Sequence, residues 1–279
     1  MKKNLLLALA FCASAGWAQT DQAWTSVGSQ KVTASKNVQR LSFPTEFKLM
    51  KLNPQSIEQV LQNAPQRNVS IHQSGVIISL PNVDGTLERF EMLEASNFTP
   101  QLQAQFPNIR AYAGKGIDDP KAIVRLSIDS RGIQAMVFRT DKRNEFIESY
   151  SEDGSIYAIY NASRNKGNLP FTCSTDDVSI AKSLHAEETN RSNTSELLTF
   201  RLALSCNAEY TNYFGGVAQA LAAMNATMTR VNGVFEMDFA IHMTMIDNSA
   251  IIYTNAATDP YTSIGQWNGQ LQSTLTSVI

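Results

Sequence analysis

The sequence has few of the residues that most often build metal sites and nucleophilic centres. It contains three histidines and three cysteines in 279 residues. The histidines lie far apart, and no H-E-x-x-H segment is present to place two of them on one helix face. A Ser-His-Asp triad is set by space rather than by sequence order, yet no G-x-S-x-G segment supports one. We therefore expect core or surface roles for the three histidines, which are His72, His185 and His242.

An excess of charge of either sign is also lacking. The formal net charge is −2, and both signs are scattered along the chain. Nucleic-acid binding proteins usually concentrate Lys and Arg on one face, and membrane-surface proteins often carry polybasic patches. We therefore expect no nucleic-acid partner and, once the N-terminal segment is removed, no membrane partner. The oligomeric state stays open.

Long apolar runs are absent except at the N-terminus. Lys2 and Lys3 precede an apolar run over residues 5–15, and Ala18 ends a small-x-small step. This pattern is typical of a secretory signal peptide, and the run is shorter than the roughly 20 residues that a membrane-spanning helix needs. The sequence predicts cleavage after Ala18 and a secreted or extracytoplasmic protein. A lipid anchor at Cys12 is a weaker alternative, because the bulky Phe11 precedes it.

Removal of residues 1–18 would leave only Cys173 and Cys206. An exported protein meets an oxidising compartment, so these two cysteines are a disulfide candidate. A second possibility is that the thiolate of Cys173 blocks the zinc ion of a following domain, because cysteine is a good zinc ligand. The compartment favours the disulfide.

The first half of the mature chain shows the two-residue period of β-strands. After a flexible start over residues 19–40, residues 41–173 predict a mainly antiparallel β domain with short helices. Ser56–Ala64 is expected to be a helix, and Val76–Leu80 should pair with Leu87–Met92 across a turn at Asp84-Gly85. The other expected elements are a helix at 99–106 and strand pairs at 122–128 with 133–138 and at 146–150 with 156–160.

A polar segment separates this domain from the rest. Residues 174–196 are rich in Ser, Thr, Asn, Asp and Glu, which is typical of a linker. Arg191 is a candidate for proteolytic processing, because cleavage concentrates in exposed polar segments. A surface loop with no processing role is an equal alternative.

Residues 197–279 show a different pattern. Leu197–Leu204 and Phe239–Met245 predict strands, and Gly215-Gly216 precedes a helix between them. Ile251–Thr254 should add a short strand. Strand, helix and strand in this order predict an α/β unit, so the fold class of the whole chain is α+β. A unit this small leaves apolar surface uncovered, so we expect a truncated domain. The helix carries an apolar stripe at alternating spacings of four and three, formed by Val217, Leu221, Met224, Met228, Val231 and Phe235.

Oxygen-bearing side chains gather near the end of the second strand. Calcium prefers carboxylate and carbonyl oxygens, so a calcium site is conceivable there, although the spacing matches no known loop. Its candidate ligands are Asp247, Asn248, Asn255, Thr258 and Asp259. The neighbouring carboxylates elsewhere are expected to be solvated turns, at Asp118-Asp119, Asp176-Asp177 and Glu187-Glu188.

Two segments carry a family resemblance. Leu197–Gly216 and Ala223–Glu236 resemble the start of the catalytic domain in a bacterial family of secreted reprolysin-like metzincins, with a further match at Asp259-Pro260-Tyr261. Upstream, the chain is more loosely similar to that family's propeptide. The upstream matches are Leu80-Pro81, Asp84-Gly85, Pro107 and the segment from Tyr112 to Pro120.

The resemblance implies a zinc-dependent endopeptidase that cleaves protein or peptide substrates. In that family, three histidines of an extended H-E-x-x-H motif hold zinc, and the glutamate activates the bound water. No position of this sequence matches those residues, so no catalytic residue is carried over and the chain by itself should be inactive. We expect the N-terminal fragment of a protease precursor. The alternative is a non-catalytic exported protein that acts as an inhibitor, chaperone or binding module.

Overall fold

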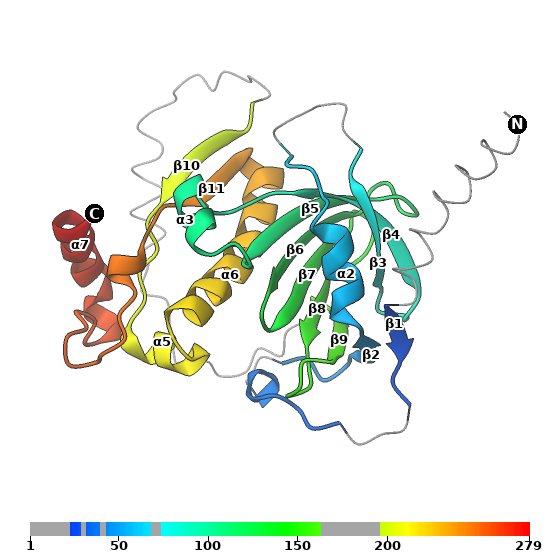
Figure 1. Ribbon diagram of the computed structural model, residues 1–279, viewed down its shortest axis with the longest axis horizontal. Helices are drawn as coiled ribbons and strands as arrows, with labels where there is room; N and C mark the ends of the chain where they lie inside the picture. The colour runs from blue at the N-terminus through cyan, green and yellow to red at the C-terminus, as the bar shows by residue number, and fades with distance from the viewer. Residues whose placement is uncertain (1–22, 29–31, 40–42, 68–73, 163–195) are drawn as a thin grey trace, which may run out of the picture.

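The computed structural model describes residues 23–28, 32–39, 43–67, 74–162 and 196–279 (Figure 1). The described residues form two regions with different architectures, which we call the β region (residues 23–162) and the α/β region (residues 196–279). The signal peptide with Ala18, most of the predicted linker, and the residues Cys173, Arg191, His72 and His185 lie outside the described residues.

The β region is a nine-stranded antiparallel sheet, strongly curved in Figure 1. The strand order is β1-β2-β9-β8-β7-β6-β5-β4-β3, so the chain meanders from β3 to β9, and β9 then pairs with β2 from the start of the region. The two edge strands of the curved sheet lie close together. The indole N–H of Trp24 in β1 donates to the carbonyl oxygen of Ser79 in β3 at 3.0 Å. The strands are β1 Trp24–Ser26, β2 Lys48–Leu52, β3 Val76–Pro81, β4 Leu87–Glu94, β5 Arg110–Gly116, β6 Ile123–Asp129, β7 Gly132–Phe138, β8 Glu145–Ser149 and β9 Ile156–Asn161.

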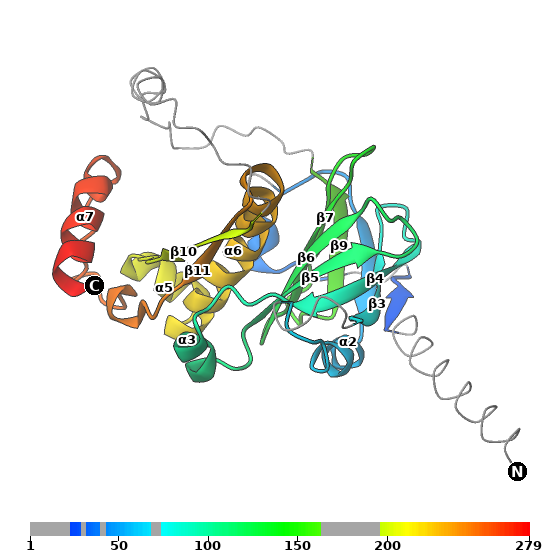
Figure 2. The same cartoon turned by 90° about the horizontal axis from the view of Figure 1, so that it is seen from above.

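Successive side chains along each strand point to opposite faces of the sheet, and the two faces are covered by different elements. On the inner face, Leu126 of β6 and its neighbours form one buried core with Ile57 and Leu61 of helix α2 (Pro54–Leu61). Arg125 lies one residue before Leu126, so it projects from the outer face. A second helix, α6 (Val217–Phe239), packs on that outer face against β5, β6 and β7, as Figure 2 shows from above.

The three predicted hairpins are confirmed. β3 pairs with β4, β6 with β7, and β8 with β9, in antiparallel register. Each hairpin has a glycine with positive φ in its turn or directly after it, a conformation that side chains rarely tolerate, at Gly85, Gly132 and Gly154. The helix predicted at 99–106 is also confirmed as α3 (Pro100–Gln105), with Thr99 as its N-cap residue.

Some expectations for the β region are wrong. Residues 19–40 were expected to be a flexible start, yet Trp24–Ser26 forms β1 and the Trp24 side chain is 4% exposed. The helix predicted at Ser56–Ala64 does form, but it runs from Pro54 to Leu61, because the fixed φ of proline suits the first helical position. A short 3₁₀ turn at Lys36–Gln39 was not predicted either.

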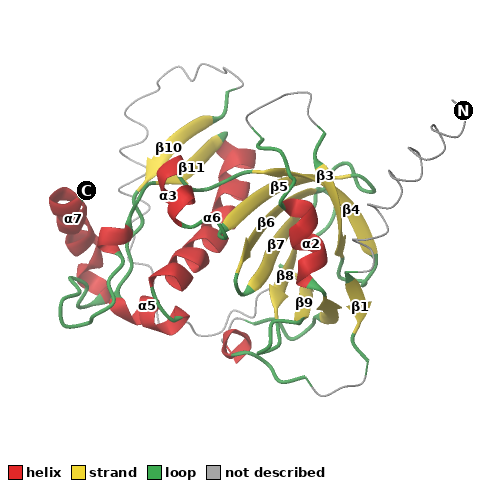
Figure 3. Cartoon of the chain, viewed as in Figure 1, coloured by secondary structure: helices red, strands yellow, loops and turns green. Residues whose placement is uncertain are grey.

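The α/β region contains a two-stranded parallel sheet. β10 (Leu198–Leu202) pairs with β11 (Ile241–Met245), and α6 connects them after the short helix α5 (Ala208–Phe214) (Figure 3). This order confirms the predicted strand–helix–strand unit. Phe239 was placed in the second strand, but it ends α6, and Ala240 turns the chain with φ 54° before β11 begins. The polar end of the sequence forms α7 (Trp267–Val278) after a 3₁₀ turn at Ile264–Gln266.

The prediction of a short strand at Ile251–Thr254 is also wrong. A 3₁₀ turn occupies Ser249–Ile251, and only an isolated bridge joins Ile252 to Cys206. The turn forms because the Asp247 carboxylate accepts hydrogen bonds from the backbone N–H and the hydroxyl of Ser249. The hydrogen bonds of the short Asp247 side chain thus stabilise a turn, although the β-branched residues Ile251 and Ile252 favour a strand.

Candidate functional site

Helix α6 carries two stripes rather than one. The predicted apolar stripe is confirmed for Leu221, Met224 and Met228, which are buried, and for the partly buried Val217 and Val231, which pack against the same core. A second, polar stripe runs along the helix at spacings of four, three and four residues, which keep side chains on one face. We call it the α6 polar stripe, and it consists of Asn225, Thr229, Asn232 and Glu236.

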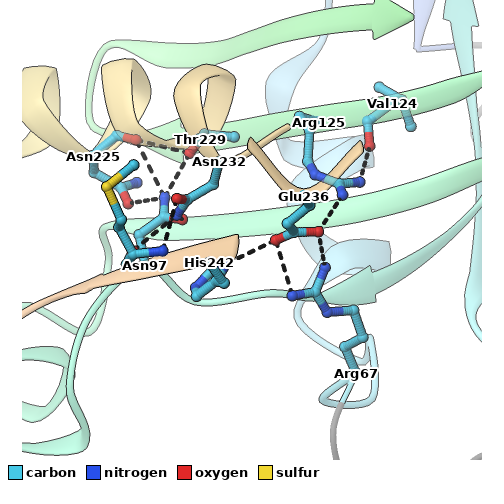
Figure 4. A network of polar contacts seen from close by, with 10 residues as sticks. Arg67, Asn97, Val124, Arg125, Asn225, Thr229, Asn232, Glu236 and His242 are labelled. Carbon is cyan, nitrogen blue, oxygen red and sulfur yellow. Dashed lines mark hydrogen bonds and ion pairs between the residues drawn. The ribbon is translucent and has the colours of Figure 1, made fainter. Parts of the chain in front are cut away.

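The first three residues of the α6 polar stripe meet one side chain of the β region. The Asn97 amide group is 2% exposed, and its Nδ2 donates to Asn225 Oδ1 at 2.9 Å and to Thr229 Oγ1 at 2.8 Å. Its Oδ1 accepts from Asn232 Nδ2 at 2.9 Å, as Figure 4 shows. A buried amide without partners costs free energy, so this reciprocal pairing is what permits the burial.

The backbone beside Asn97 extends the small sheet. Met245 N donates to Asn97 O at 2.6 Å, and Thr99 N donates to Met245 O at 2.9 Å. Phe98 thereby forms a parallel bridge with Met245 of β11, and its side chain is 4% exposed. One residue of the β region thus lies beside β11 as a partial third strand.

The fourth residue of the α6 polar stripe is the centre of an ion cluster. Glu236 accepts from Arg67 at 2.7 Å, from Arg125 at 2.5 Å and from His242 Nδ1 at 2.7 Å (Figure 4). The Glu236 side chain is 9% exposed and that of Arg125 is 10% exposed. Both arginines come from the β region, so a carboxylate of one region is neutralised largely by cations of the other.

The cluster fixes the protonation state of Glu236. Burial alone would raise the pKa of this carboxyl group, but hydrogen bonds from His242 and Arg67 and the positive charge of Arg125 outweigh it and lower the pKa to about 2. Glu236 is therefore ionised at neutral pH and acts only as an acceptor, so His242 Nδ1 carries the donating proton. Burial lowers the pKa of Arg125, and the adjacent Glu236 opposes that shift.

The described residues do not fit a zinc ion. No group of three or more His, Cys, Asp or Glu side chains occurs in the parts of the chain that the structure describes. Glu236 and His242 are neighbours, but the guanidinium groups of Arg67 and Arg125 lie against the same carboxylate. Two fixed positive charges oppose a divalent cation at that position. His242 lies in β11 and is 7% exposed, which agrees with the core role expected for it.

The proposed calcium ligands shape turns. Asn255 Oδ1 accepts from Ala257 N at 2.9 Å, and Asp259 accepts from Ala208 N at 2.5 Å and from Tyr261 N at 2.7 Å. Asn248 is fully buried and donates to the carbonyl of Leu204. Calcium binding there remains a prediction.

Cys206 is buried and has no disulfide partner among the described residues, and its Sγ lies 3.3 Å from the hydroxyl oxygen of Thr211. Burial raises the pKa of this thiol, which disfavours its reactive thiolate form. Because Cys173 lies outside the described residues, both the disulfide and the zinc-blocking role of Cys173 remain predictions.

The acidic turn at Asp118-Asp119 is tied into the sheet. Asp118 pairs with Arg89 at 2.6 Å, and Asp119 pairs with the buried Arg139 at 3.1 Å. Both side chains stay largely exposed, at 37% for Asp118 and 39% for Asp119, so the expected solvated turn is confirmed and carries ion pairs in addition. The other two acidic pairs lie outside the described residues.

A cavity of about 830 Å³ is lined by residues of α5, of α6 and of strands β7 and β8. Both arginines in its lining are already paired, since Arg230 bonds to Glu148 at 2.9 Å and Arg131 bonds to Asp129 at 2.7 Å. We assign no ligand to it. Among the described residues, none of the helices is both long enough and apolar enough to cross a membrane.

Comparison with known families gives a match to the α/β region. Residues 196–279 match the family described as metallo-peptidase family M12B, reprolysin-like. The chain is therefore reprolysin-like over this segment. A search of curated proteins gave no match. The reprolysin-like segment contains the whole strand–helix–strand unit, including the α6 polar stripe.

The sequence did not predict that Arg67, Asn97, Arg125 and Glu236 take part in polar contacts between the two regions. A signal was present, because Asn225, Thr229, Asn232 and Glu236 repeat with a helical period, each one residue after a member of the apolar stripe. The partners could not be identified in the same way, because Arg67 lies 169 residues and Arg125 lies 111 residues from Glu236.

Proposed function

We propose that this chain is the N-terminal part of the precursor of a secreted zinc-dependent endopeptidase. The family match over residues 196–279 carries the proposal, because that family consists of metallopeptidases. The substrates would be proteins or peptides. The β region would be the prosegment, and residues 163–195 would connect it to the peptidase domain.

Two features support this assignment. The α/β region has the strand–helix–strand order expected for the start of such a domain, and β10 exposes apolar side chains that further elements would cover. Leu198 is 51% exposed and Phe200 is 50% exposed. The described residues do not supply a zinc site, so the zinc ligands and the general base would come from a continuation of the domain.

The decisive experiment is to sequence the coding DNA through and beyond the codon for Ile279. A frame that continues into H-E-x-x-H supports the proposal. The longer product should then cleave casein or a quenched peptide, lose that activity with a zinc chelator, and regain it with added zinc. A stop codon directly after Ile279 would rule out zinc proteolysis by this product on ligand count.

Export is tested separately. We expect the mature N-terminus to begin after Ala18, and N-terminal sequencing of protein from the culture medium or periplasm would check this. Protein that retains residues 1–18 and stays in the cytoplasm would contradict the proposed localisation. Peptide mapping without reduction would show whether Cys173 and Cys206 are joined.

A further inference from the structure

The contact between the two regions has an apolar part and a polar part. The apolar part is the segment from Ala95 to Ile109, which contains α3 and which we call the α3 arm. Its Phe98, Leu102 and Ile109 are buried in one core with residues of α6 and β11. The β region therefore contributes side chains to a core that otherwise belongs to the α/β region.

The polar part makes the contact selective. Apolar side chains tolerate many neighbours, whereas buried amides and charges tolerate only partners that satisfy them. Asn97 satisfies three residues of the α6 polar stripe at once, through Asn225 Oδ1, Thr229 Oγ1 and Asn232 Nδ2. A helix with apolar residues at those positions would leave both ends of the Asn97 amide unpaired.

The charges at the other end of the stripe are complementary across the contact. Glu236 faces Arg67 and Arg125 of the β region, and its remaining partner is His242 of β11. Separation of the regions would leave the carboxylate with His242 alone. Between the two polar groups, Gly233 allows a close approach, because a Cβ there would lie 2.7 Å from Phe138 and 2.8 Å from Arg125.

We propose that the β region is a recognition module for helix α6, and that it binds the α/β region without a covalent connection. Its partner is a helix face that presents amide, hydroxyl, amide and carboxylate groups at spacings of four, three and four residues. Asn97 and the Arg67–Arg125 pair select this face, and the α3 arm supplies apolar contact. The inference concerns binding alone, so it stands whether or not peptidase activity is found.

The test uses the full chain with a specific protease site inserted between residues 163 and 195. After cutting, size-exclusion chromatography and intact mass spectrometry show whether the two pieces stay together. We expect co-elution of the β region with residues 196–279. Separate elution of the pieces, or precipitation of the second piece while the first stays in solution, would overturn the proposal.

Selectivity is tested with two shape-conserving substitutions in the same cut protein. Asn97→Asp keeps the size but cannot donate to Asn225 and Thr229, and Glu236→Gln keeps the shape but removes the charge. Each should weaken the complex by roughly tenfold or more, as the loss of a buried hydrogen bond or ion pair predicts. The matched controls are Asn255→Asp and Glu209→Gln, because Asn255 uses its oxygen in an exposed turn and Glu209 is exposed.

Folding and binding are separated by a second measurement. Circular dichroism of each uncut variant reports whether the chain folds, and only folded variants are cut. If Asn97→Asp fails to fold, Glu236→Gln carries the test. Folded variants that dissociate more readily than their controls support the proposal, and folded variants that bind as tightly as the unchanged chain refute the selective role of the polar groups.

Discussion

The two regions differ in how completely each covers its own apolar surface. The β region curls until its edge strands meet through Trp24 and Ser79, and its core includes a helix, α2. The α/β region has two strands, leaves Leu198 and Phe200 about half exposed, and takes Phe98, Leu102 and Ile109 from the β region. A curved antiparallel sheet can enclose a core by itself, whereas a parallel strand pair depends on elements packed around it. We therefore expect the fold of the β region to depend less on the α/β region than the fold of the α/β region depends on the β region.

The largest effect is expected from the core of the β region. Leu126 is fully buried, so Leu126→Ala should lower the free energy of unfolding by about 3–5 kcal/mol through lost burial and a cavity. Guanidinium unfolding monitored by Trp24 fluorescence measures this loss, in a chain that begins after Ala18, and so lacks Trp17, and that carries Trp267→Phe.

The matched control is Leu198→Ala on β10. The Leu198 side chain is 51% exposed, so the change should stay within about 0.5 kcal/mol. Equal effects at the two leucines would contradict the difference between the regions.

A somewhat smaller effect should cross from one region to the other. Leu102 belongs to the β region in sequence but is buried in the core of α6, so Leu102→Ala should cost about 2–4 kcal/mol. Hydrogen exchange should increase in α6 more than in β7 and β8. The control is Leu197→Ala, since that side chain is 44% exposed. Faster exchange confined to the α3 arm would mean that the core is not shared.

Glu236→Gln should destabilise the contact by roughly 3 kcal/mol, because it leaves Arg67 and Arg125 without their counter-charge. The pH dependence has a definite sign. The pKa of Glu236 is lowered to about 2 from its usual 4.5, so its stabilisation is complete above pH 4.5 and is lost as the pH falls toward 2.

Thermal unfolding across this pH range measures the effect. The unchanged chain should lose more stability between pH 4.5 and pH 2 than the Glu236→Gln variant does. Parallel curves for the two proteins would show that Glu236 is not the group that titrates.

The smallest effect concerns the close approach of α6 to the sheet. Gly233→Ala adds a methyl group against Phe138 and Arg125, which should cost about 1–3 kcal/mol, partly offset by the roughly 1 kcal/mol gain in helix propensity. Gly269→Ala in α7 is the control, because nothing lies within 4 Å of its added Cβ and only the favourable term remains. A stabilised Gly233→Ala chain would show that the contact is looser than described.

Local patterns were sufficient for part of the fold. The hairpins at β3–β4, β6–β7 and β8–β9 followed from alternation and turn glycines, and α6 followed from its apolar stripe and the preceding glycines. β1, β2 and β5 were missed, because β1 has three residues and the sequence of β5, Arg110–Gly116, contains two glycines that weaken the strand signal. The partners of Glu236 were missed because no local pattern connects residues more than 100 positions apart.

The sequence by itself determined the class of the elements, the change of architecture between the two regions and the reprolysin-like character of residues 196–279. These depend on short-range periodicity and on contiguous motifs. Only the tertiary structure decided that Asn97 and Arg125 of one region satisfy the α6 polar stripe of the other. The physical reason is that burial of polar groups is tolerated only where partners converge in space, and convergence is a property of the packed chain.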